Sequence, residues 1–443
     1  MASEWAAVPL SELTSTPPTY GVVQPGKDTA NGSPMLRVNN FQGHSLNLSE
    51  VMRIAPEIEA KYGRTRIQAG DVLLTIVGSV GQVTVVPDEL SGWNIARAIA
   101  MIRPNKPELS RWISLVLRSP QAQYQLGVTA NTTVQTTINL KDLRELRIPL
   151  PNDDERNAIA HILGTLDDKI ELNRRRNQTL EAMARALFKD WFIDFGPVRA
   201  KMEGREPYLP ADLWQLFPDR LDDEGKPEGW EVQPLSELLT IIGGGTPKTS
   251  VEEYWGGDIP WFSVVDTPPA NDVFVVATEK NITAQGLTGS SARLIPKGTT
   301  IISARGTVGN LAIAGCDMTF NQSCYGLRGT GRAGDYFVYL TAQQMVDQLK
   351  SMAHGSVFST ITRQTFEAIQ RPVPPPSVLA AFEGLVTGWF DAVLANVEDS
   401  RTLAQFRNTL LPKLISGELR IKDADKFLER AGCHTSSQTG SVS

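Results

Sequence analysis

Side chains that suit the recognition of nucleic acid gather in short loops in both halves of the sequence. Arginine, asparagine and glutamine pair with guanine and adenine edges, whereas serine and threonine hydroxyls hold phosphates. One such residue alone more often caps a loop than reads a base, so only the set, present in both halves, predicts a DNA-binding surface. The predicted contact residues are Arg37, Asn39, Asn40, Ser79, Gln82, Thr132, Thr133, Thr246, Lys248, Trp261, Ser263, Arg305, Thr307, Asn321 and Gln322.

Two segments imitate catalytic motifs without meeting their chemical requirements. Residues 243–249 (GGGTPKT) look like a phosphate-binding loop, but Pro247 stands before Lys248 and offers no N–H to a phosphate. Asp219, Glu224 and Lys226 match the carboxylate and lysine set of a nuclease, but in a Gly- and Pro-rich stretch that would not fix a metal ion. We therefore predict that residues 243–249 form a surface turn and that the segment with Asp219, Glu224 and Lys226 is a solvated loop. We predict no catalytic residue and no metal site in the chain.

Composition places the chain among ordinary globular proteins. Of its 443 residues, 21% are charged and 41% hydrophobic, and its formal net charge of −6 still allows a local basic surface for DNA. No apolar run approaches the roughly 18–20 residues of a membrane span, and residues 1–10 (MASEWAAVPL) have neither the basic region nor the apolar core expected of a signal sequence. We expect a cytoplasmic protein with no membrane association, in which Cys316 and Cys324 are reduced core thiols.

The sequence repeats itself after roughly 220 to 230 positions. Residues 5–13 (WAAVPLSEL) recur as 230–238 (WEVQPLSEL), and residues 70–81 (GDVLLTIVGSVG) recur as 298–309 (GTTIISARGTVG). A third match, between residues 138–151 and 361–374, closes each half. A unit of this length is too long for a solenoid repeat of roughly 20–50 residues. The repeat therefore predicts two similar globular modules that carry two similar sites.

A long amphipathic helix follows each module. Residues 153–192 contain no proline, Asn152 or Asp153 can cap them, and their apolar residues recur every three, four or seven positions. A second stripe follows residues 374–376 and is expected to end at Pro412 and Gly417. Helices of about 57 Å, at 1.5 Å per residue, would bury their stripes against each other in an antiparallel pair. The predicted seam, which also serves partner binding, comprises Ile159, Leu163, Leu166, Ile170, Leu180, Leu187, Trp389, Val393, Leu403, Phe406 and Leu410.

These elements predict an α+β fold with two tandem, mixed β-rich modules, two long antiparallel coiled-coil helices and a pseudo-two-fold internal repeat. Short apolar bursts such as 72–77, 98–102, 299–303 and 312–314 predict strands. Residues from 112 onward, through a Gln-rich stretch, predict one helix in the first module, and residues 336–352 predict its counterpart. The expected parts are a module at 1–150, a helix at 151–195, a connector at 196–229 with a short helix near 211–217, a module at 230–374, a helix at 375–417 and a tail at 418–443.

Several of these segments together resemble the specificity subunit of type I restriction–modification enzymes. The resemblance rests on the paired WxxxPLSEL openings, the GDVL and GxVG segments, and IPLP followed by residues 155–160 (ERNAIA). It continues through 166–173 (LDDKIELN), 188–192 (FKDWF) and 410–417 (LLPKLISG), and it covers nearly the whole chain. In the second half, 389–393 (WFDAV) replace the LDDKI segment, so the two halves are not expected to make identical partner contacts.

The resemblance implies two target-recognition domains, each reading half of a split, asymmetric site on double-stranded DNA, with the helices as a ruler between them. It implies assembly with two modification subunits, which use S-adenosylmethionine to methylate adenine, and with restriction (translocase) subunits that use ATP and Mg²⁺; no cofactor is expected in this chain. Helices 153–192 and 377–411 would dock the modification subunits. Unlike loops in the two modules, such as 36–41 and 259–263, predict two different half-sites.

Two other classes of function remain open from the residues alone. A stand-alone nuclease or other enzyme would need a constellation of carboxylates or histidines, and a duplicated protein-binding scaffold would keep the repeat but bind no specific duplex. The cluster Arg174, Arg175 and Arg176 points around a helix rather than along one face. We interpret it as solvated or partner-facing rather than as a DNA contact.

Overall fold

The computed structural model describes residues 5–43, 45–129, 137–268, 272–331, 333–354 and 360–421. The chain divides into two compact units, one formed by residues 1–171 and 402–443 and the other by residues 172–401. Each unit contains one β-rich module and one segment of each long helix, α5 (Asp153–Phe192) and α11 (Pro376–Ser416). The helices are therefore part of the core of each unit as well as its link to the other.

The module of the first unit contains a four-stranded antiparallel sheet in the order β2-β10-β7-β8, flanked by smaller sheets. The smaller sheets have the orders β1-β11, β6-β3-β9 and β4-β5. The strands are β1 (Ala7–Pro9), β2 (Thr14–Tyr20), β3 (Ser33–Leu36), β4 (Phe41–Gln42), β5 (Ser45–Leu46), β6 (Met52–Ile54), β7 (Val72–Thr75), β8 (Val83–Val85), β9 (Asn94–Ile95), β10 (Ile99–Pro104) and β11 (Arg147–Pro149), and the helices are α1 (Pro56–Glu59), α2 (Leu109–Arg118), α3 (Pro120–Thr129) and α4 (Leu140–Glu145).

The module of the second unit repeats this plan. Its main sheet has the order β13-β20-β17-β18-β15, and the smaller sheets are β12-β21 and β16-β14-β19. The strands are β12 (Glu231–Pro234), β13 (Leu239–Gly243), β14 (Trp255–Phe262), β15 (Phe274–Val275), β16 (Lys280–Ile282), β17 (Thr300–Ser303), β18 (Leu311–Ala314), β19 (Thr319–Phe320), β20 (Cys324–Gly329) and β21 (Gln370–Val373), and the helices are α6 (Gly196–Met202), α7 (Ala211–Trp214), α8 (Ala284–Thr288), α9 (Asp335–His354) and α10 (Arg363–Ala368). The predicted repeat is present in the matching strand orders β2-β10-β7-β8 and β13-β20-β17-β18, whereas β15 extends only the second sheet and the β4-β5 sheet occurs only in the first module.

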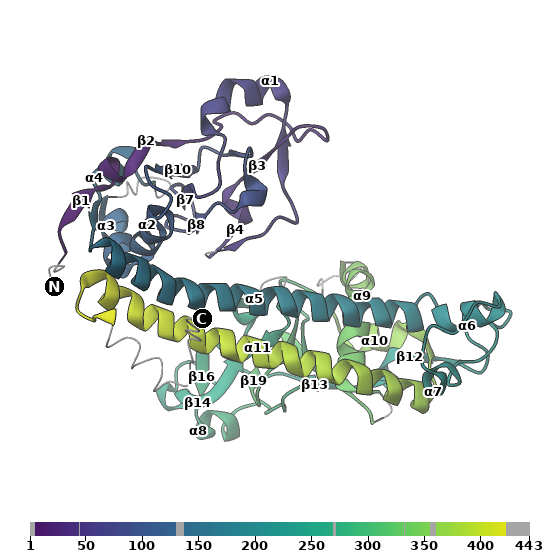
Figure 1. The fold of residues 1–443 in the computed structure, drawn as a ribbon. Coiled ribbons are helices and arrows are strands. Elements are labelled where there is room, and N and C mark those ends of the chain that lie inside the picture. Colours follow the sequence, from purple (N-terminus) through teal and green to yellow (C-terminus); the bar gives the residue numbers. More distant parts are fainter. Residues whose placement is uncertain are drawn as a thin grey trace, which may run out of the picture. The chain divides into compact units, whose positions relative to one another are not determined.

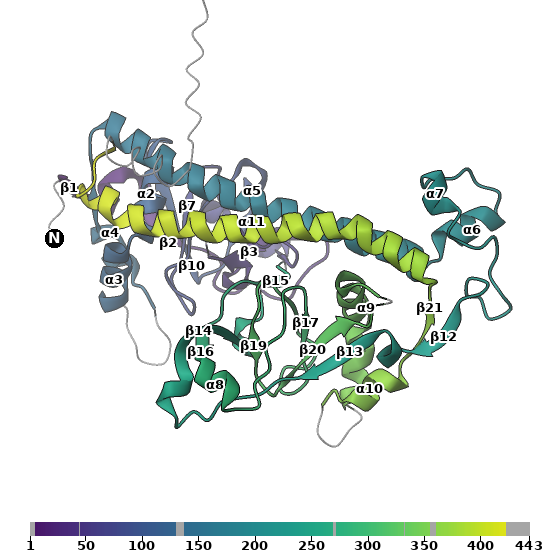
Figure 2. The same cartoon turned by 90° about the horizontal axis from the view of Figure 1, so that it is seen from below.

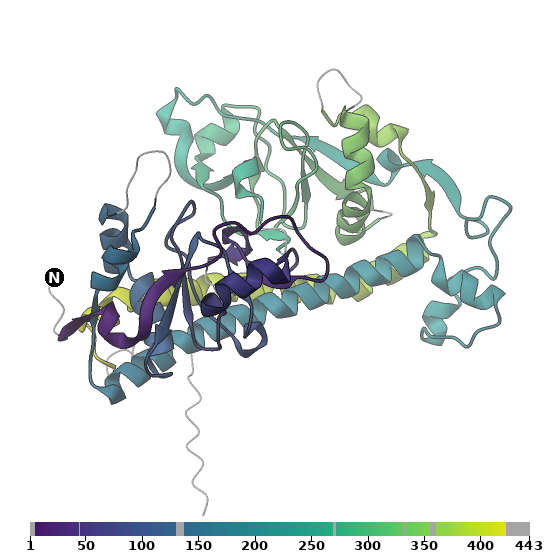
Figure 3. The ribbon, with the colours of Figure 1, turned by 90° about the horizontal axis from the view of Figure 1, so that it is seen from above.

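The two long helices lie side by side and run antiparallel (Figure 1). In the first unit, Glu155 and Asp167 of α5 bond to Arg420, just beyond α11, and to Arg407 of α11. In the second unit, Asn177 of α5 bonds to Asn396 of α11. Rising numbers on α5 thus meet falling numbers on α11, as predicted. The views from below and above show the same two helices adjacent (Figures 2 and 3).

The apolar stripes pack against the modules as well as against each other. Ile159, Leu163 and Leu166 share one buried cluster with Leu403 and Leu410 and with the first module. Phe188, Phe382, Phe390 and Val393 join the larger cluster of the second module. The prediction that the stripes mainly bury each other is therefore incomplete, because each helix segment also forms one wall of a module core.

Helix α11 ends just before Gly417, within the predicted range, but it differs from the sequence prediction in two details. It continues through Pro412 to Ser416, because Leu414 and Ile415 beyond the proline are fully packed in the first unit and offset the lost backbone hydrogen bond. Its length and an 18-residue window of mean hydropathy 1.5 also meet the criterion for a membrane span, contrary to our expectation for the chain. Its apolar residues, such as Val378, Phe382 and Val386, instead lie in the core of the second unit.

Two shorter helical segments also differ from prediction. The helix expected from residue 112 onward is two helices, α2 and α3, because Pro120 cannot continue the hydrogen bonding of α2 and Ser119 before it is extended. The connector holds α6 in addition to the predicted short helix, α7. Helix α9 confirms the predicted counterpart at 336–352, and Asn152 caps α5 by accepting the Glu155 N–H at 2.9 Å.

Candidate nucleic-acid interface

A tight hairpin occurs at the same place in both modules. The Thr75 hydroxyl donates to the Ser79 carbonyl at 2.6 Å and accepts the Gln82 N–H at 2.9 Å. In the second module, the Ser303 hydroxyl donates to the Thr307 carbonyl and accepts the Asn310 N–H at 2.8 Å. Gly78 and Gly306 adopt positive φ at the two tips, a conformation that glycine tolerates. The hairpins leave Ser79 in one module, and Arg305 and Thr307 in the other, exposed at the tip.

A second loop is also built alike in both modules. The Arg37 N–H donates to the Asn40 side chain at 2.9 Å, and the Ser263 N–H donates to the Asp266 carboxylate at 2.8 Å. Each loop follows a strand, β3 or β14, that pairs in parallel with β9 or β19. The shared frame therefore holds Arg37 and Ser263 at equivalent positions with different side chains.

In the second unit, backbone hydrogen bonds bring four predicted loops together. The Gly245 N–H donates to Phe320, and the Ala304 and Arg305 N–H groups donate to Ser323. Thr246 donates to the Gln322 side chain, and the Trp261 indole donates to the Gly245 carbonyl at 3.0 Å. A Cβ at Gly244 would collide with the Asn321 carbonyl, so the glycine run serves close packing rather than phosphate binding.

The first unit joins its loops through a related set of bonds. The Gln82 side chain accepts the Gly43 N–H at 3.0 Å and so ties the hairpin to the loop after Asn40. The Ile76 N–H donates to the Ala98 carbonyl, and the equivalent bond in the second module joins Ala304 to Ser323. Likewise the Val22 N–H donates to the Ile95 carbonyl, and its equivalent joins Gly245 to Phe320. These matches make Arg97, which is exposed, the counterpart of Gln322. Arg97 is not among the contact residues predicted from the sequence, although the alignment of residues 94–98 with 319–323 places it opposite Gln322.

The predicted contact residues differ in accessibility. Trp261 is 7% exposed, and Asn40 is 2% exposed with its amide donating to Asn47 and Glu50. These two residues therefore hold the loops together and do not present a free edge to a base. Thr132 and Thr133 lie outside the described residues. The exposed set is Asn39, Ser79, Lys248, Arg305, Thr307 and Gln322, and the half-buried set is Arg37, Gln82, Thr246, Ser263 and Asn321.

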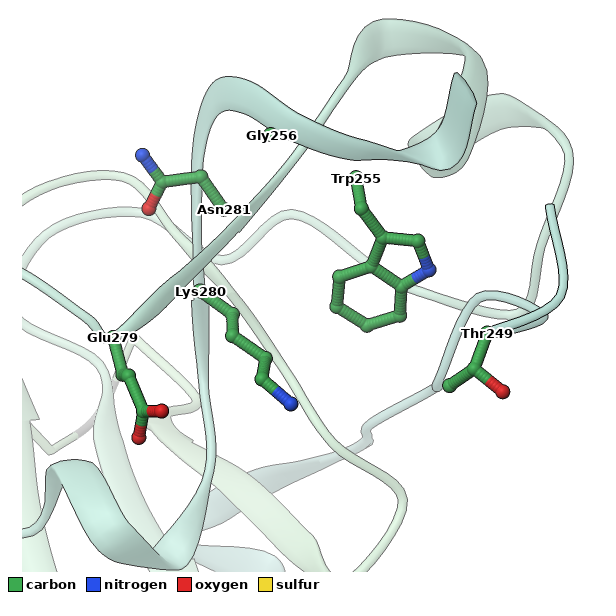
Figure 4. Close-up of a pocket in the computed structure, with 6 residues that line it drawn as sticks. All are labelled: Thr249, Trp255, Gly256, Glu279, Lys280 and Asn281. Carbon is green, nitrogen blue, oxygen red and sulfur yellow. The ribbon is translucent and has the colours of Figure 1, made fainter. Parts of the chain in front are cut away.

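A pocket of about 420 Å³ adjoins the loops of the second module, lined by Thr249, Trp255, Gly256, Glu279, Lys280 and Asn281. Figure 4 shows the Trp255 ring and the Lys280 side chain on this pocket, with Thr249 on the neighbouring loop. The Trp255 indole donates to the Lys248 carbonyl at 3.3 Å and packs edge-on against Trp261, with ring centroids 5.1 Å apart. Trp255 therefore joins the wall of the pocket to the loop that carries Thr246 and Lys248.

An ion-pair network fastens the first module to the helices. Asp167 of α5 accepts from Arg118 of α2 at 2.6 and 3.0 Å and from Arg407 of α11 at 2.8 Å. Burial disfavours the charged carboxylate, but the two arginines outweigh it and hold the pKa of Asp167 below its ordinary value. In contrast, the neighbouring Asp168 pairs with Arg111 at 3.0 Å on the surface.

In the second unit, the equivalent contact between the module and a long helix is between aromatic rings. Phe390 takes the place of Asp167 in the repeat, is 1% exposed and stacks on Tyr336 with ring centroids 4.4 Å apart. The replacement of LDDKI by WFDAV thus exchanges an ionic attachment for an apolar one. Of the predicted seam, Ile159, Leu163, Leu166, Val393, Leu403 and Leu410 are buried, and Ile170, Leu180, Leu187, Trp389 and Phe406 are half-buried.

Other groups that could do chemistry have structural roles. Cys316 and Cys324 are free thiols, and burial raises the pKa of Cys324 to about 12. The nuclease-like segment is a charged turn in which Lys226 pairs with Asp222 and with Glu224. Within the described ranges, no group of three or more histidine, cysteine or acidic side chains could hold a metal ion.

Glu181 of α5 is a buried carboxylate whose ionisation opposes folding. Burial, together with the charge of Asp272, raises its pKa from 4.5 to about 7, against the opposing charge of Arg185 at 3.5 Å. Between these two pH values the folded chain keeps a proton that the unfolded chain has lost, so stability falls as the pH rises through this window. We expect Glu181→Gln to stabilise the protein at pH 8 by about 1 kcal/mol or more, with little gain at pH 4.5. Urea denaturation at both pH values measures this, and an equal effect at both would contradict it.

Comparison with known proteins gives one consistent family. The model described as the type I restriction modification DNA specificity domain matches residues 5–182 and 227–410. A specificity subunit of the type I restriction enzyme HindI from Haemophilus influenzae is 29% identical over 402 residues, which cover 80% of this chain and 87% of that protein. The EcoBI specificity subunit of Escherichia coli is 33% identical over 195 residues, 41% of each chain. The crystal structure of a type I system S subunit from M. genitalium has a TM-score of 0.53 at 16% identity and covers 93% of this chain and 96% of that one.

Proposed function

The chain belongs to the family of type I restriction–modification DNA specificity subunits, and we propose that each of its two modules reads one half of a bipartite, asymmetric DNA site. The observation that carries this proposal is the repeated loop frame, which presents different side chains at equivalent positions. Arg97 in the first module corresponds to Gln322 in the second, and Arg37 corresponds to Ser263. Arginine favours guanine and glutamine favours adenine, so one frame would read two sequences.

The helix pair would set the distance between the half-sites. Each helix runs without a break through both units, and 40 residues of α5 extend about 60 Å. Half-sites about one turn apart are separated by roughly 34–36 Å, a distance that such helices are long enough to span. The helices support this role because residues of both α5 and α11 belong to each unit, so the chain passes between the units within helices as well as through the connector.

Lengthening both helices should therefore lengthen the recognised site. One heptad inserted near Asn177 in α5, and one at the facing position of α11, adds about 10 Å. We expect the gap between half-sites to grow by about three base pairs while the half-site bases stay the same. Methylation mapping measures the gap. A heptad inserted into the connector at residues 218–226 is the control and should leave the gap unchanged, and an unchanged gap in the helix variant would refute the ruler.

We further propose that the helices dock the two modification subunits. A groove of about 430 Å³ between α5 and α11 is lined by Arg175, Arg176, Thr179, Leu180, Ala392 and Asn396. Met183, on the same helix, is 44% exposed, and Leu385 on α11 is 38% exposed. An apolar surface with an arginine rim suits a partner that offers apolar and acidic side chains.

The resulting complex would be a cytoplasmic adenine methyltransferase and, with restriction subunits, an ATP-dependent endonuclease. This chain would be its non-catalytic subunit. S-adenosylmethionine, ATP and Mg²⁺ would all bind to the partner subunits, and the target adenine would be flipped into the methyltransferase. The charged turn at residues 218–226 gives no support to a stand-alone nuclease, and the glycine run at 243–249 gives none to an enzyme that binds a nucleotide.

Co-purification tests this proposal. The chain should co-purify with modification subunits produced in the same cells, and the complex should protect specific adenines on double-stranded DNA. An enzyme would act on DNA without the modification subunits, and a protein scaffold would associate with them without protecting any sequence. Failure of both association and sequence-specific methylation would overturn the proposal.

A further inference from the structure

The repeat makes α5 and α11 equivalent helices, and the hydrogen bonds at their middle are images of one another. Asn173 and Asn396 are 223 positions apart, and Asn177 and Ser400 have the same separation. The Asn173 amide donates to the Ser400 hydroxyl at 3.2 Å, and the Asn396 amide donates to the Asn177 carbonyl oxygen at 2.9 Å. Exchanging the helices converts one bond into the other, so a local two-fold axis relates them here.

This symmetry creates a problem of partner choice. At the apolar seam positions the equivalent residues are also apolar, for example Leu163 and Val386, Leu180 and Leu403, and Leu187 and Leu410. A seam of this kind packs α5 against α11 and would also pack each helix against its own copy in a second chain. Apolar burial is non-directional and does not distinguish these pairings.

The symmetry is broken where Asp167 meets Arg407. Their contact is 2.8 Å, and the two side chains are 22% and 12% exposed. The repeat-equivalent residues are Phe390 for Asp167 and Ala184 for Arg407, which are 1% and 0% exposed in the core of the second unit. The Asp167–Arg407 ion pair thus corresponds, under the repeat, to two apolar residues, Phe390 and Ala184.

We propose that the Asp167–Arg407 ion pair selects the pairing of α5 with α11 of the same chain over the pairing of each helix with its own copy in another chain. In a pair of α5 helices Asp167 would face Ala184, and in a pair of α11 helices Arg407 would face Phe390. A pair of α5 helices loses the Asp167–Arg407 ion pair, although Asp167 keeps Arg118. A pair of α11 helices buries the Arg407 charge without a carboxylate, which is strongly unfavourable. The ion pair therefore keeps two different modules on one helix pair. This inference depends on the helix pairing alone and goes beyond the proposed DNA recognition.

The full-length Arg407→Ala variant tests this selection. It makes position 407 the same as position 184 and leaves Asp167 paired with Arg118. The native pairing then loses its advantage over a pair of α5 helices, and a pair of α11 helices no longer buries an arginine. We expect its dimerisation constant, measured by analytical ultracentrifugation, to exceed that of the wild type by about tenfold or more. Arg401→Ala is the matched control, because Arg401 is an exposed arginine of α11 that donates to the Val276 carbonyl.

A crosslink identifies the pairing in any dimer. Asn173 lies next to the local axis, so Asn173→Cys would face its own copy when two α5 helices pair. In the Arg407→Ala background we expect a short thiol crosslinker to join residue 173 of two chains, as identified by peptide mass spectrometry, and we expect no such link in the wild-type background. An Arg407→Ala variant that stays as monomeric as the wild type, or that dimerises without this crosslink, would overturn the proposal.

Discussion

Replacing Asp167 with alanine is expected to destabilise the first unit by about 3–5 kcal/mol. The substitution leaves Arg118 and Arg407, whose side chains are 7% and 12% exposed, without the carboxylate that neutralises both. A buried charge that loses its partner costs more than the pair contributes when intact, because the desolvation of the remaining ion is no longer offset. Guanidinium denaturation of the isolated chain measures the loss.

The adjacent carboxylate provides a matched control for this prediction. Asp168 pairs with Arg111, but the two side chains are 65% and 49% exposed, so water already solvates both charges. We expect Asp168→Ala to cost less than about 1 kcal/mol. Equal losses for the two variants would show that the Asp167 network does not fasten the module to the helices.

The second large effect is expected in DNA recognition, and it should be confined to one half-site per substitution. Arg97→Ala removes the exposed arginine of the first loop frame, and Gln322→Ala removes the equivalent glutamine of the second. A base-reading pair contributes about 1–3 kcal/mol of discrimination. We therefore expect each variant, assembled with the modification subunits, to bind its site about 5- to 150-fold more weakly and to accept other bases in one half only.

Two measurements separate base reading from general DNA attraction. Binding to sites randomised in one half at a time shows where specificity is lost, and the salt dependence of binding shows whether a phosphate contact was removed. Lys248→Ala is the comparison. If the exposed Lys248 contacts phosphate, its removal should weaken binding to all DNA sequences alike. Relaxed specificity in both halves after a single substitution would contradict the division of labour between the modules.

The sequence predicts the duplication and the long helices well because both depend on features that recur along the chain. The matches at residues 5–13 and 230–238 establish two modules, and the regular apolar spacing in 153–192 establishes a helix that begins at its predicted cap. Local breaks are harder to predict. Pro120 follows the extended Ser119 that ends α2, whereas Pro412 lies inside α11, where Leu414 and Ile415 beyond it are buried.

The candidate site was only partly predictable for a different reason. Residue type alone selected Asn40 and Trp261 together with Gln322 and Arg305, but hydrogen bonds between distant segments decide which of them remain exposed. Asn40 bonds to Asn47 and Glu50, so its amide is used inside the loop. Residue type does not single out Arg97, because its neighbours, Ala96 and Ala98, form no polar cluster with it. Its significance emerges from the hydrogen-bond frame that the two modules share.

Genome-wide methylation mapping in cells that carry this chain with its modification subunits tests the central claim most directly. Two unlike modules on one helix pair predict methylated adenines within a motif of two different half-sites, separated by a gap of constant length. A palindromic motif, a gap of variable length, or methylation that persists unchanged when this chain is deleted would contradict the account.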